Sequence, residues 1–312
     1  MNNTIFISLA SYCDDMLEFT LKSAFNSAKN KENIFFGVVD QNHVNSRDTI
    51  KSLEFSNQIR YCHIFPDDSL GVSWARHLCF SLYNNEKYFL QVDSHTYFEE
   101  NWDENLIIQY KTLLGKSSKP IISTYPYGFS IEENNEITFK KPSGKTVLLL
   151  RPKKELKIDK ENLVLQFRAK HITSSEAILG CHIAAGFLFA NGHFIEEIPY
   201  DPYLYFHGEE QSLAIRSFTK GWDIYHPKWI PLYHLYKKAG TKYENHHWSG
   251  DISKQRDFDW VYLQKRAKDR LQKLIYGKLN SSIYGLGKDR TIDEYIKFSG
   301  IDYFNYTITD SI

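Results

Sequence analysis

Short apolar runs alternate with amphipathic, helix-like stretches through the first 125 residues of this 312-residue chain. Strands that alternate with helices of about 10–15 residues are typical of a mainly parallel sheet with helices on both faces, because parallel strands need long crossover connections. The sequence therefore predicts a Rossmann-like α/β fold. The expected strands are residues 4–10, 34–39, 59–65, 88–92 and 121–124, and the expected helices are residues 14–28, 73–83 (capped by Ser73) and 102–114.

The pattern changes in the second part of the chain. Residues 130–161 hold charged, Pro- and Gly-rich clusters around one apolar run at 147–150, which indicates an excursion from the sheet. We predict a main domain at residues 1–250, with a variable excursion at 130–170, and a helical extension at 251–312 that packs on it. Further strands are expected at residues 178–190 and 223–226, and further helices at residues 208–220 and 256–276.

The composition limits the classes of function. The 38 Lys and Arg residues balance the 38 Asp and Glu residues, which argues against bulk nucleic-acid binding. No stretch reaches the ~20 apolar residues of a membrane span, and no secretory signal is visible at the N-terminus. The four cysteines form no CxxC pair, which indicates free thiols in a reducing compartment. We expect a soluble cytoplasmic protein with no nucleic-acid partner and no transmembrane segment.

The strongest local signal is an apolar strand that ends directly in Asp93-Ser94-His95. In extended chain, side chains two residues apart point the same way, so Asp93 and His95 can share one ion. The carboxyl ends of the strands are also where open α/β sheets bind ligands. A carboxylate with an imidazole suits Mn²⁺ better than Mg²⁺, which prefers oxygen ligands alone. The alternative interpretation is that Asp93 caps a turn and His95 is an ordinary loop residue.

An acidic pair, Glu209 and Glu210, opens the helix expected at residues 208–220. Acidic residues in a first turn favour the helix dipole and need no further function. A Pro- and Tyr-rich segment at residues 199–205 precedes the pair, however, and is typical of a wall that presents a carboxylate. The pattern leaves both interpretations open.

His234 follows a short strand, 24 residues after Glu210. A lone histidine is most often structural, and His246 and His247 lie in a polar stretch typical of a surface loop. The chain contains neither the HExxH zinc helix nor the GxxxxGK[ST] phosphate loop. These absences argue against a zinc-helix protease and a P-loop nucleotidase.

Together, these segments resemble the GlcNAc-transferase family typified by the enzyme that modifies hydroxyproline on Skp1. More distantly, they are similar to the polypeptide N-acetylgalactosaminyltransferases. The most specific part of the resemblance is the combination of Asp93-Ser94-His95 with the acidic helix and the later histidine. The resemblance rests on residues 5–12, 37–41, 71–76, 90–95, 102–103, 206–225, 234–236, 290–295 and 299–302.

The resemblance implies a GT-A glycosyltransferase fold, with the main domain as the catalytic unit and residues 130–170 on the acceptor side. It implies a UDP-sugar donor, UDP-GlcNAc first, and transfer to a hydroxyl of a glycan or polypeptide with retention of anomeric configuration. It also implies an Mn²⁺ cofactor, with Mg²⁺ as an alternative ion. By position, the metal ligands are Asp93, His95 and His234.

The same resemblance implies roles for further residues. Glu209 and Glu210 fall where the family has an acidic residue near the sugar and acceptor, and the sequence does not separate sugar binding from covalent catalysis for them. The expected nucleotide-binding residues are Ser8, Ser11, Tyr12, Asp40, Arg76, Asp93 and Ser94.

Two other classes share parts of this pattern. A nucleotidyltransferase that makes sugar nucleotides has a comparable sheet, but it carries a Gly-rich loop after the first strand, where this chain has Ser11-Tyr12-Cys13-Asp14-Asp15. A non-catalytic sugar-binding module accounts for the 15% aromatic residues but not for Asp-x-His at the end of a buried strand.

Overall fold

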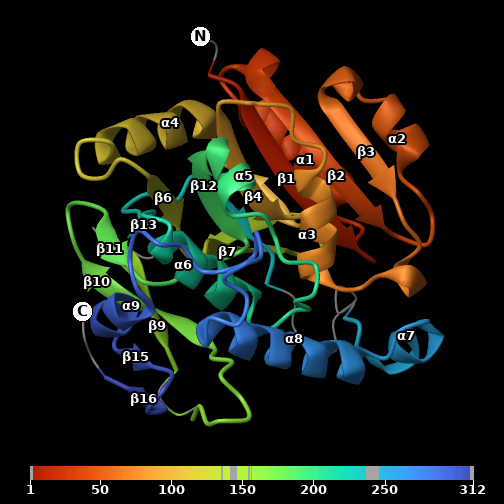
Figure 1. Cartoon of the computed structure of the whole chain (residues 1–312). Helices are drawn as coiled ribbons and strands as arrows, with labels where there is room; N and C mark the ends of the chain where they lie inside the picture. Colours follow the sequence, from red (N-terminus) through yellow and green to blue (C-terminus); the bar gives the residue numbers. More distant parts are fainter. Residues whose placement is uncertain are drawn as a thin grey trace.

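The computed structural model describes residues 3–134, 136–140, 146–153, 155, 157–236 and 246–309. Within these residues, eight strands form one twisted sheet in the order β11-β13-β6-β12-β4-β1-β2-β3 (Figure 1). The strands are β1 (Ile5–Tyr12), β2 (Ile34–Gln41), β3 (Ile59–His63), β4 (Tyr88–Asp93), β6 (Pro120–Ser123), β11 (Ile178–Gly180), β12 (Phe187–Asn191) and β13 (Asp223–His226).

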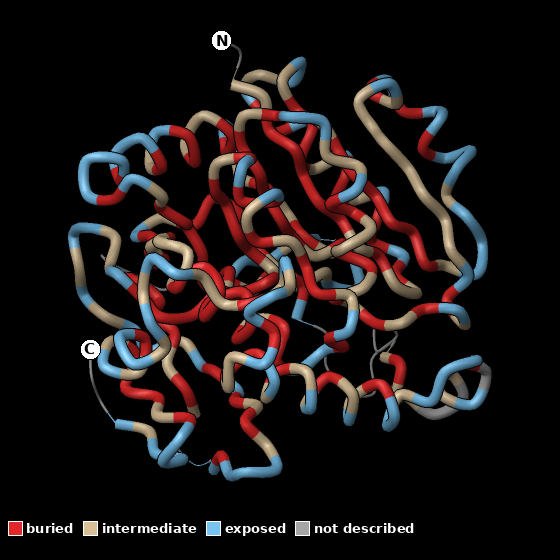
Figure 2. The backbone as a smooth tube through the Cα atoms, in the orientation of Figure 1, coloured by how far each residue is buried: buried red, intermediate tan, exposed pale blue. Residues whose placement is uncertain are grey.

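Helices cover both faces of this sheet, and the alternation of side chains along β1 explains why. Ile5, Ile7 and Leu9 belong to the core cluster that includes α1 and α4, whereas Phe6 belongs to the cluster on the opposite face with α5 and α6. Figure 2 shows these central strands as almost continuously buried. The helices are α1 (Leu17–Ser27), α2 (Arg47–Lys51), α3 (Val72–Phe80), α4 (Trp102–Leu113), α5 (His193–Glu197) and α6 (Glu209–Thr219).

Two smaller sheets lie beside the carboxyl ends of the central strands. The first has the order β5-β14-β7-β8 and links segments far apart in sequence, and the second is the antiparallel pair β9–β10. The described parts of residues 130–170 therefore contribute to two antiparallel strand pairs, β7–β8 and β9–β10, outside the main sheet. The strands are β5 (Thr96–Phe98), β7 (Tyr127–Ile131), β8 (Ile137–Lys140), β9 (Thr146–Pro152), β10 (Phe167–Thr173) and β14 (Leu232–His234).

The C-terminal part of the chain packs against the rest through a core of its own. Leu263, Ala267 and Leu271 of one helix are buried with Phe167 and Ile215 in a single cluster. No helix in the described part of the chain is long and apolar enough to cross a membrane. The C-terminal elements are α7 (Gly250–Gln255), α8 (Trp260–Ile275), α9 (Ile292–Ser299), β15 (Ile301–Asp302) and β16 (Thr307–Ile308).

The sheet is mainly parallel, as expected: β3, β2, β1 and β4 run parallel to one another, as do β6 and β13, whereas β12 runs antiparallel to both β4 and β6. The strand-like sequence expected at residues 178–190 contains two strands, β11 and β12. The structure corrects two expectations about helix starts. The helix expected at 256–276 begins only at Trp260, because the Asp259 side chain caps its first turn. Ser73 does not cap α3; Gly71 precedes that helix, and the Ser73 hydroxyl donates to the Asp201 carbonyl.

Candidate active site

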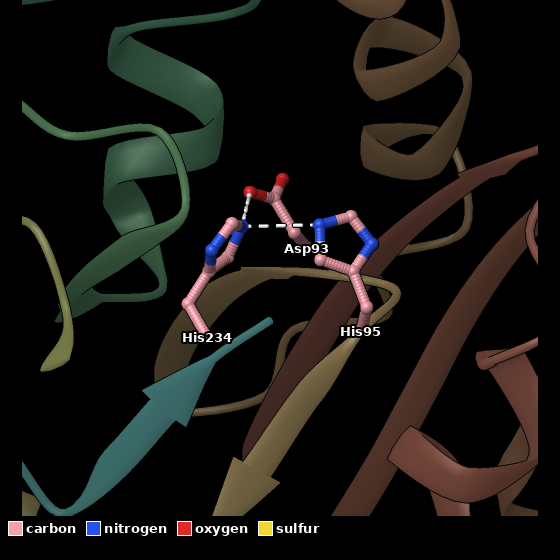
Figure 3. A group of neighbouring side chains, drawn as sticks. All are labelled: Asp93, His95 and His234. Atoms are coloured by element: carbon pink, nitrogen blue, oxygen red, sulfur yellow. Dashed lines mark hydrogen bonds and ion pairs between the residues drawn. The ribbon is translucent and has the colours of Figure 1, made fainter. Parts of the chain in front are cut away.

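Asp93, His95 and His234 meet at the carboxyl end of β4, and their side chains point toward one another (Figure 3). The His234 Nε2 atom lies 3.0 Å from Asp93 Oδ2 and 3.0 Å from His95 Nε2. One oxygen and two nitrogens, all within 4.8 Å of one another, form this group. The donor set is therefore suitable for one first-row divalent ion.

The backbone of the small sheet explains how His234 reaches the other two. The chain turns after Asp93 and continues into β5, which pairs antiparallel with β14, so that His234 lies opposite Thr96. The ladder continues one residue further, where the Leu235 N–H donates to the His95 carbonyl at 3.0 Å. Pairing of two short strands thus places the two imidazoles side by side.

Asp14 forms a hydrogen bond with the Nδ1 atom of His95. The Asp14 Oδ2 atom lies 2.6 Å from His95 Nδ1 and 2.6 Å from the Ser94 hydroxyl, and the residue is almost fully buried. A carboxylate at this position accepts the Nδ1 proton, which leaves the Nε2 lone pair of His95 directed toward Asp93 and His234. The sequence pattern missed this residue, although an acidic side chain in the turn after the first strand was the available signal.

Arg76, on α3, lies behind Asp93 and connects it to Glu209. Its guanidinium donates to Asp93 Oδ1 at 2.7 Å and to Glu209 Oε1 at 2.7 Å, and only 4% of its side chain is exposed. Burial alone disfavours the Asp93 carboxylate, but the hydrogen bond from His234 and the charge of Arg76 outweigh it and hold its pKa well below the usual range. Asp93 therefore remains an anion in this site.

Burial raises the pKa of Glu209 to about 8, although the adjacent Arg76 charge opposes the shift. Glu209 is buried, whereas 29% of the Glu210 side chain is exposed. The Glu210 carboxylate accepts from the Ala185 N–H at 2.8 Å and lies 3.5 Å from His182 Nε2. The two acidic residues thus occupy different environments, although both belong to the wall of one cavity.

Two cavities meet at Asp93. The first, here the aromatic cavity, has a volume of about 320 Å³ and contains all three members of the Asp-His-His group. Its walls include Tyr12, Tyr205, His247 and Trp248. The His247 ring packs edge-on against Tyr12, with ring centres 4.2 Å apart. The flat apolar walls suit a planar heterocyclic ring.

The second cavity, here the Glu210 cavity, has a volume of about 300 Å³ and is lined by Arg76, Asp93, Tyr125, His182 and Glu210 among others. Val72 and Phe206 belong to the walls of both cavities. The Asp-His-His group therefore lies where an aromatic-walled cavity joins a polar one.

A larger cavity of about 550 Å³ lies beside α1 and the loop after β2. It includes Asp14 in its wall, but none of Asp93, His95 and His234. Size alone would direct attention to this cavity, whereas the ligand chemistry lies at the other two.

Some of the residues that were expected to bind a nucleotide are buried behind the walls of these cavities. Ser8 and Ser11 are fully buried in β1, and the Ser94 hydroxyl is buried against Asp14. The Asp40 carboxylate is buried as well, where it accepts from the Ser46 N–H and the Tyr61 hydroxyl and so shapes the loop after β2. Of the expected nucleotide-binding residues, Tyr12, Asp93 and Ser94 border the aromatic cavity, and Arg76 borders the Glu210 cavity.

Gly186 is a second residue that the sequence pattern did not assign to the site. A Cβ atom at this position would lie 2.8 Å from Asp93 Oδ2. Only a glycine lets the backbone before β12 approach this carboxylate so closely. His246 and His247 also lie in the wall of the aromatic cavity rather than on an open surface loop.

The central sheet ends in the three-residue sequence Asp-x-His, a further histidine faces it, and two joined cavities lie at the carboxyl edge. Together these features define a glycosyltransferase of the GT-A fold. The family described as Glycosyltransferase (GlcNAc) matches residues 4–55 and 44–305 of this chain. The chain belongs to this family. A search of curated proteins found no match.

Three solved structures are similar to this chain, and the first of them supports the fold. The structure of GalNAc-T7 with UDP, GalNAc and Mn²⁺ has a TM-score of 0.60 at 12% identity, over 98% of this chain and 58% of that one. S. aureus TarS 1–349 with UDP-GlcNAc has a TM-score of 0.47 at 12% identity, over 89% of this chain and 73% of that one. A second structure of TarS 1–349 has a TM-score of 0.46 at 11% identity, over 74% of this chain and 60% of that one.

Proposed function

We propose that this chain transfers a sugar, with GlcNAc as the first candidate, from a UDP-sugar to a hydroxyl of an acceptor, and retains the anomeric configuration. One observation carries the proposal: Asp93, His95 and His234 converge at the junction of the aromatic cavity and the Glu210 cavity. This arrangement provides a place for a diphosphate between a nucleoside on one side and a sugar on the other. Membership of the family supports the same reaction.

Asp93, His95 and His234 would hold the divalent ion, for which we propose Mn²⁺. The residues fit it because Asp93 is kept anionic by Arg76 and the Nδ1 atom of His95 is occupied by Asp14. When bound, such an ion neutralises the charge that develops on the departing diphosphate. GalNAc-T7, with the same fold, contains Mn²⁺ and UDP in its structure.

The protein side chains would contribute by positioning the donor and the acceptor. The uracil would lie in the aromatic cavity beside Tyr12, and Glu210 would accept hydrogen bonds from sugar hydroxyls in the other cavity. We assign Glu209 to the support of Arg76, because its carboxylate is buried in that ion pair. In the transfer, the bond from the anomeric carbon to the phosphate oxygen breaks, the acceptor oxygen forms the new bond, and its proton passes to the leaving phosphate.

Hydrolysis of UDP-sugars by the purified chain tests the donor and the ion together. We expect turnover of UDP-GlcNAc with Mn²⁺ to exceed that of UDP-Glc and UDP-Gal, and EDTA to abolish it. The Asp93→Asn variant should remain folded by circular dichroism and lose turnover, whereas Asp223→Asn, distant in the ion pair with Arg290, should keep it. Full turnover in excess EDTA, or preference for a GDP-sugar, would show that the assignment is wrong.

The acceptor class, a glycan or a polypeptide, and the cytoplasmic location remain predictions from the sequence. The division into a catalytic unit at residues 1–250 and an extension at 251–312 is likewise a proposal. Transfer to a hydroxyproline peptide, tested with the same UDP-GlcNAc, would support the first of these.

A further inference from the structure

Positive charge is concentrated in two segments of a chain that is neutral as a whole. Residues 140–171 contain ten Lys and Arg residues but three Asp and Glu residues, and α8 contains five against one. These segments hold 15 of the 38 basic residues and 4 of the 38 acidic ones, so the rest of the chain is net negative. Three of the basic residues, Lys141, Lys145 and Lys154, lie outside the described residues.

The fold brings the two segments together. The Gln272 side chain on α8 donates to the Lys160 carbonyl in the connection between β9 and β10, at 2.6 Å. Phe167 at the start of β10 and Leu271 on α8 are buried in one cluster. Figure 1 shows one end of α8 beside β9. The charges therefore form one region, here the basic face, on β9, β10, their connection and α8.

Several charged side chains of the basic face are exposed, whereas Arg270 on α8 is paired with the buried Asp201. Arg168 and Lys170 on β10 are exposed, as are Lys157 and Lys160 in the connection. Arg168 forms an exposed ion pair with Glu155 at 3.2 Å, a kind of contact that contributes little in solvent. Lys265 on α8 is exposed as well. These charges produce a positive field over the surface.

The basic face borders the Glu210 cavity directly. Lys153, at the end of β9, lines the cavity together with Gln166 and Phe167. Burial lowers the pKa of His207 in the same wall, Glu210 opposes this change, and the charge of Lys268 on α8 adds to the decrease. A molecule that reaches Glu210 from this side therefore crosses the basic face.

We propose that the acceptor is an anionic glycan, with phosphate or carboxylate groups repeated along its length, that lies on the basic face and presents a hydroxyl to the Glu210 cavity. This inference rests on the proposed function and names its acceptor class. Charge complementarity identifies the occupant, because several basic elements lead to one cavity. The rings of Tyr125, Phe167 and Phe206 in that cavity offer the flat apolar faces against which sugar rings pack.

A membrane surface fits the basic face less well. Peripheral membrane helices combine basic residues with an apolar face that enters the bilayer. The apolar residues of α8, among them Leu263, Ala267 and Leu271, are instead buried in the protein core. Val261 and Tyr262, which are exposed, lie only at the first turn of that helix.

A pair of polymers that differ only in charge tests the inference. We expect the full chain to bind dextran sulfate and not dextran in calorimetry at low salt, and the affinity to fall steeply as NaCl is raised. The double variant Arg168→Glu/Lys170→Glu should lower the affinity for dextran sulfate by about tenfold or more. The matched control Lys51→Glu/Lys111→Glu reverses two exposed charges on α2 and α4 and should bind as the unmodified chain does.

Hydrolysis of UDP-GlcNAc separates this inference from the proposed function. Both double variants should hydrolyse the donor at the unmodified rate, because none of the four positions lines the aromatic cavity or the Glu210 cavity. Equal binding of dextran and dextran sulfate, or equal loss of affinity in the two variants, would overturn the anionic acceptor. Co-sedimentation with phosphatidylserine vesicles that dextran sulfate does not displace would also overturn it, in favour of a lipid-facing surface. Absence of donor hydrolysis with selective dextran sulfate binding would instead reject the donor assignment alone.

Discussion

Asp93 uses its two oxygens for different purposes. Oδ1 accepts from Arg76, and Oδ2 faces His234. The carboxylate is thereby oriented before any ligand arrives, and the cost of orienting it is met during folding. The imidazoles of His95 and His234 complete the Asp-His-His group.

The first prediction concerns His234. Replacement with alanine removes one of the three proposed ligand atoms, so His234→Ala should weaken Mn²⁺ binding and make UDP affinity nearly independent of Mn²⁺ while the aromatic cavity remains. Calorimetry with UDP, with and without Mn²⁺, measures both effects. His193→Ala, an exposed histidine on α5, is the control and should change neither. Metal-enhanced UDP binding that survives in His234→Ala would remove this residue from the ligand set.

The second prediction concerns Asp14. In Asp14→Asn the side chain keeps its size but loses its charge and one acceptor oxygen, so it holds the His95 ring less firmly. Loss of such a carboxylate partner reduces metal affinity by about 10- to 100-fold. Direct Mn²⁺ titration of the apo chain, monitored by electron paramagnetic resonance, gives this affinity without reference to turnover. Asp15→Asn, the exposed neighbour, should leave it unchanged, and an equal loss in both variants would exclude a specific role for Asp14.

At the scale of elements, α3 is positioned by the residue before it. Gly71 has a φ of 104°, which side-chain-bearing residues rarely adopt, and a Cβ atom there would lie 2.3 Å from the Tyr205 ring. The start of α3 and the loop that carries Tyr205 are thus in direct backbone-to-ring contact. This contact places Arg76 behind Asp93, because Arg76 lies in the second turn of the same helix.

The third prediction follows from that contact. Gly71→Ala should lower the free energy of unfolding by about 1–3 kcal/mol, through backbone strain and the displaced Tyr205 ring. Urea denaturation measures this change. Gly115→Ala is the matched control, since a Cβ atom there meets its nearest neighbour at an ordinary 3.5 Å. Equal stability of the two variants would show that the turn before α3 relaxes without cost.

At the scale of the whole molecule, the cluster around α8 joins the C-terminal segment to the catalytic unit. Leu271 is fully buried in it, together with Phe167 of β10 and Ile215 of α6. The extension expected at residues 251–312 therefore shares a core with the strands and the helix that line the Glu210 cavity.

The fourth prediction tests this shared core. Leu271→Ala leaves a cavity in it and should cost about 2–5 kcal/mol of unfolding free energy, with a single cooperative transition for the whole chain. Calorimetric melting measures both quantities. Val261→Ala, at an exposed position of the same helix, should change the melting temperature little. Two separate transitions in Leu271→Ala would mean that the C-terminal segment folds independently.

The order of most central elements could be predicted from the sequence alone. The apolar runs of β1, β2 and β4 and the helical periods of α1 and α4 are local patterns, because a buried strand or an amphipathic helix selects residue types within a few positions. The end of β4 at Asp93, followed by His95, was likewise readable. The physical reason differs from the expected alternation, because the chain bends at Ser94 and His95 instead of remaining extended.

Other features depended on partners distant in sequence. The antiparallel insertion of β12 between β4 and β6 depends on which strands meet, and nothing within residues 187–191 encodes that choice. The proximity of His234 to His95 depends on the pairing of β14 with β5. The family resemblance anticipated that proximity, whereas the local pattern around His234 did not.

Tertiary structure determined the partners of the side chains around Asp93, His95 and His234. The sequence assigned Arg76 and Asp40 to the nucleotide without indicating their partners. In the structure Arg76 pairs with Asp93 and Glu209, and Asp40 is hydrogen-bonded within its own loop. Asp14 was overlooked because its partner is 81 residues away. A charged side chain in the sequence shows which chemistry is available, but only the folded chain determines its partner, since burial forces each charge to find one wherever the packing brings it.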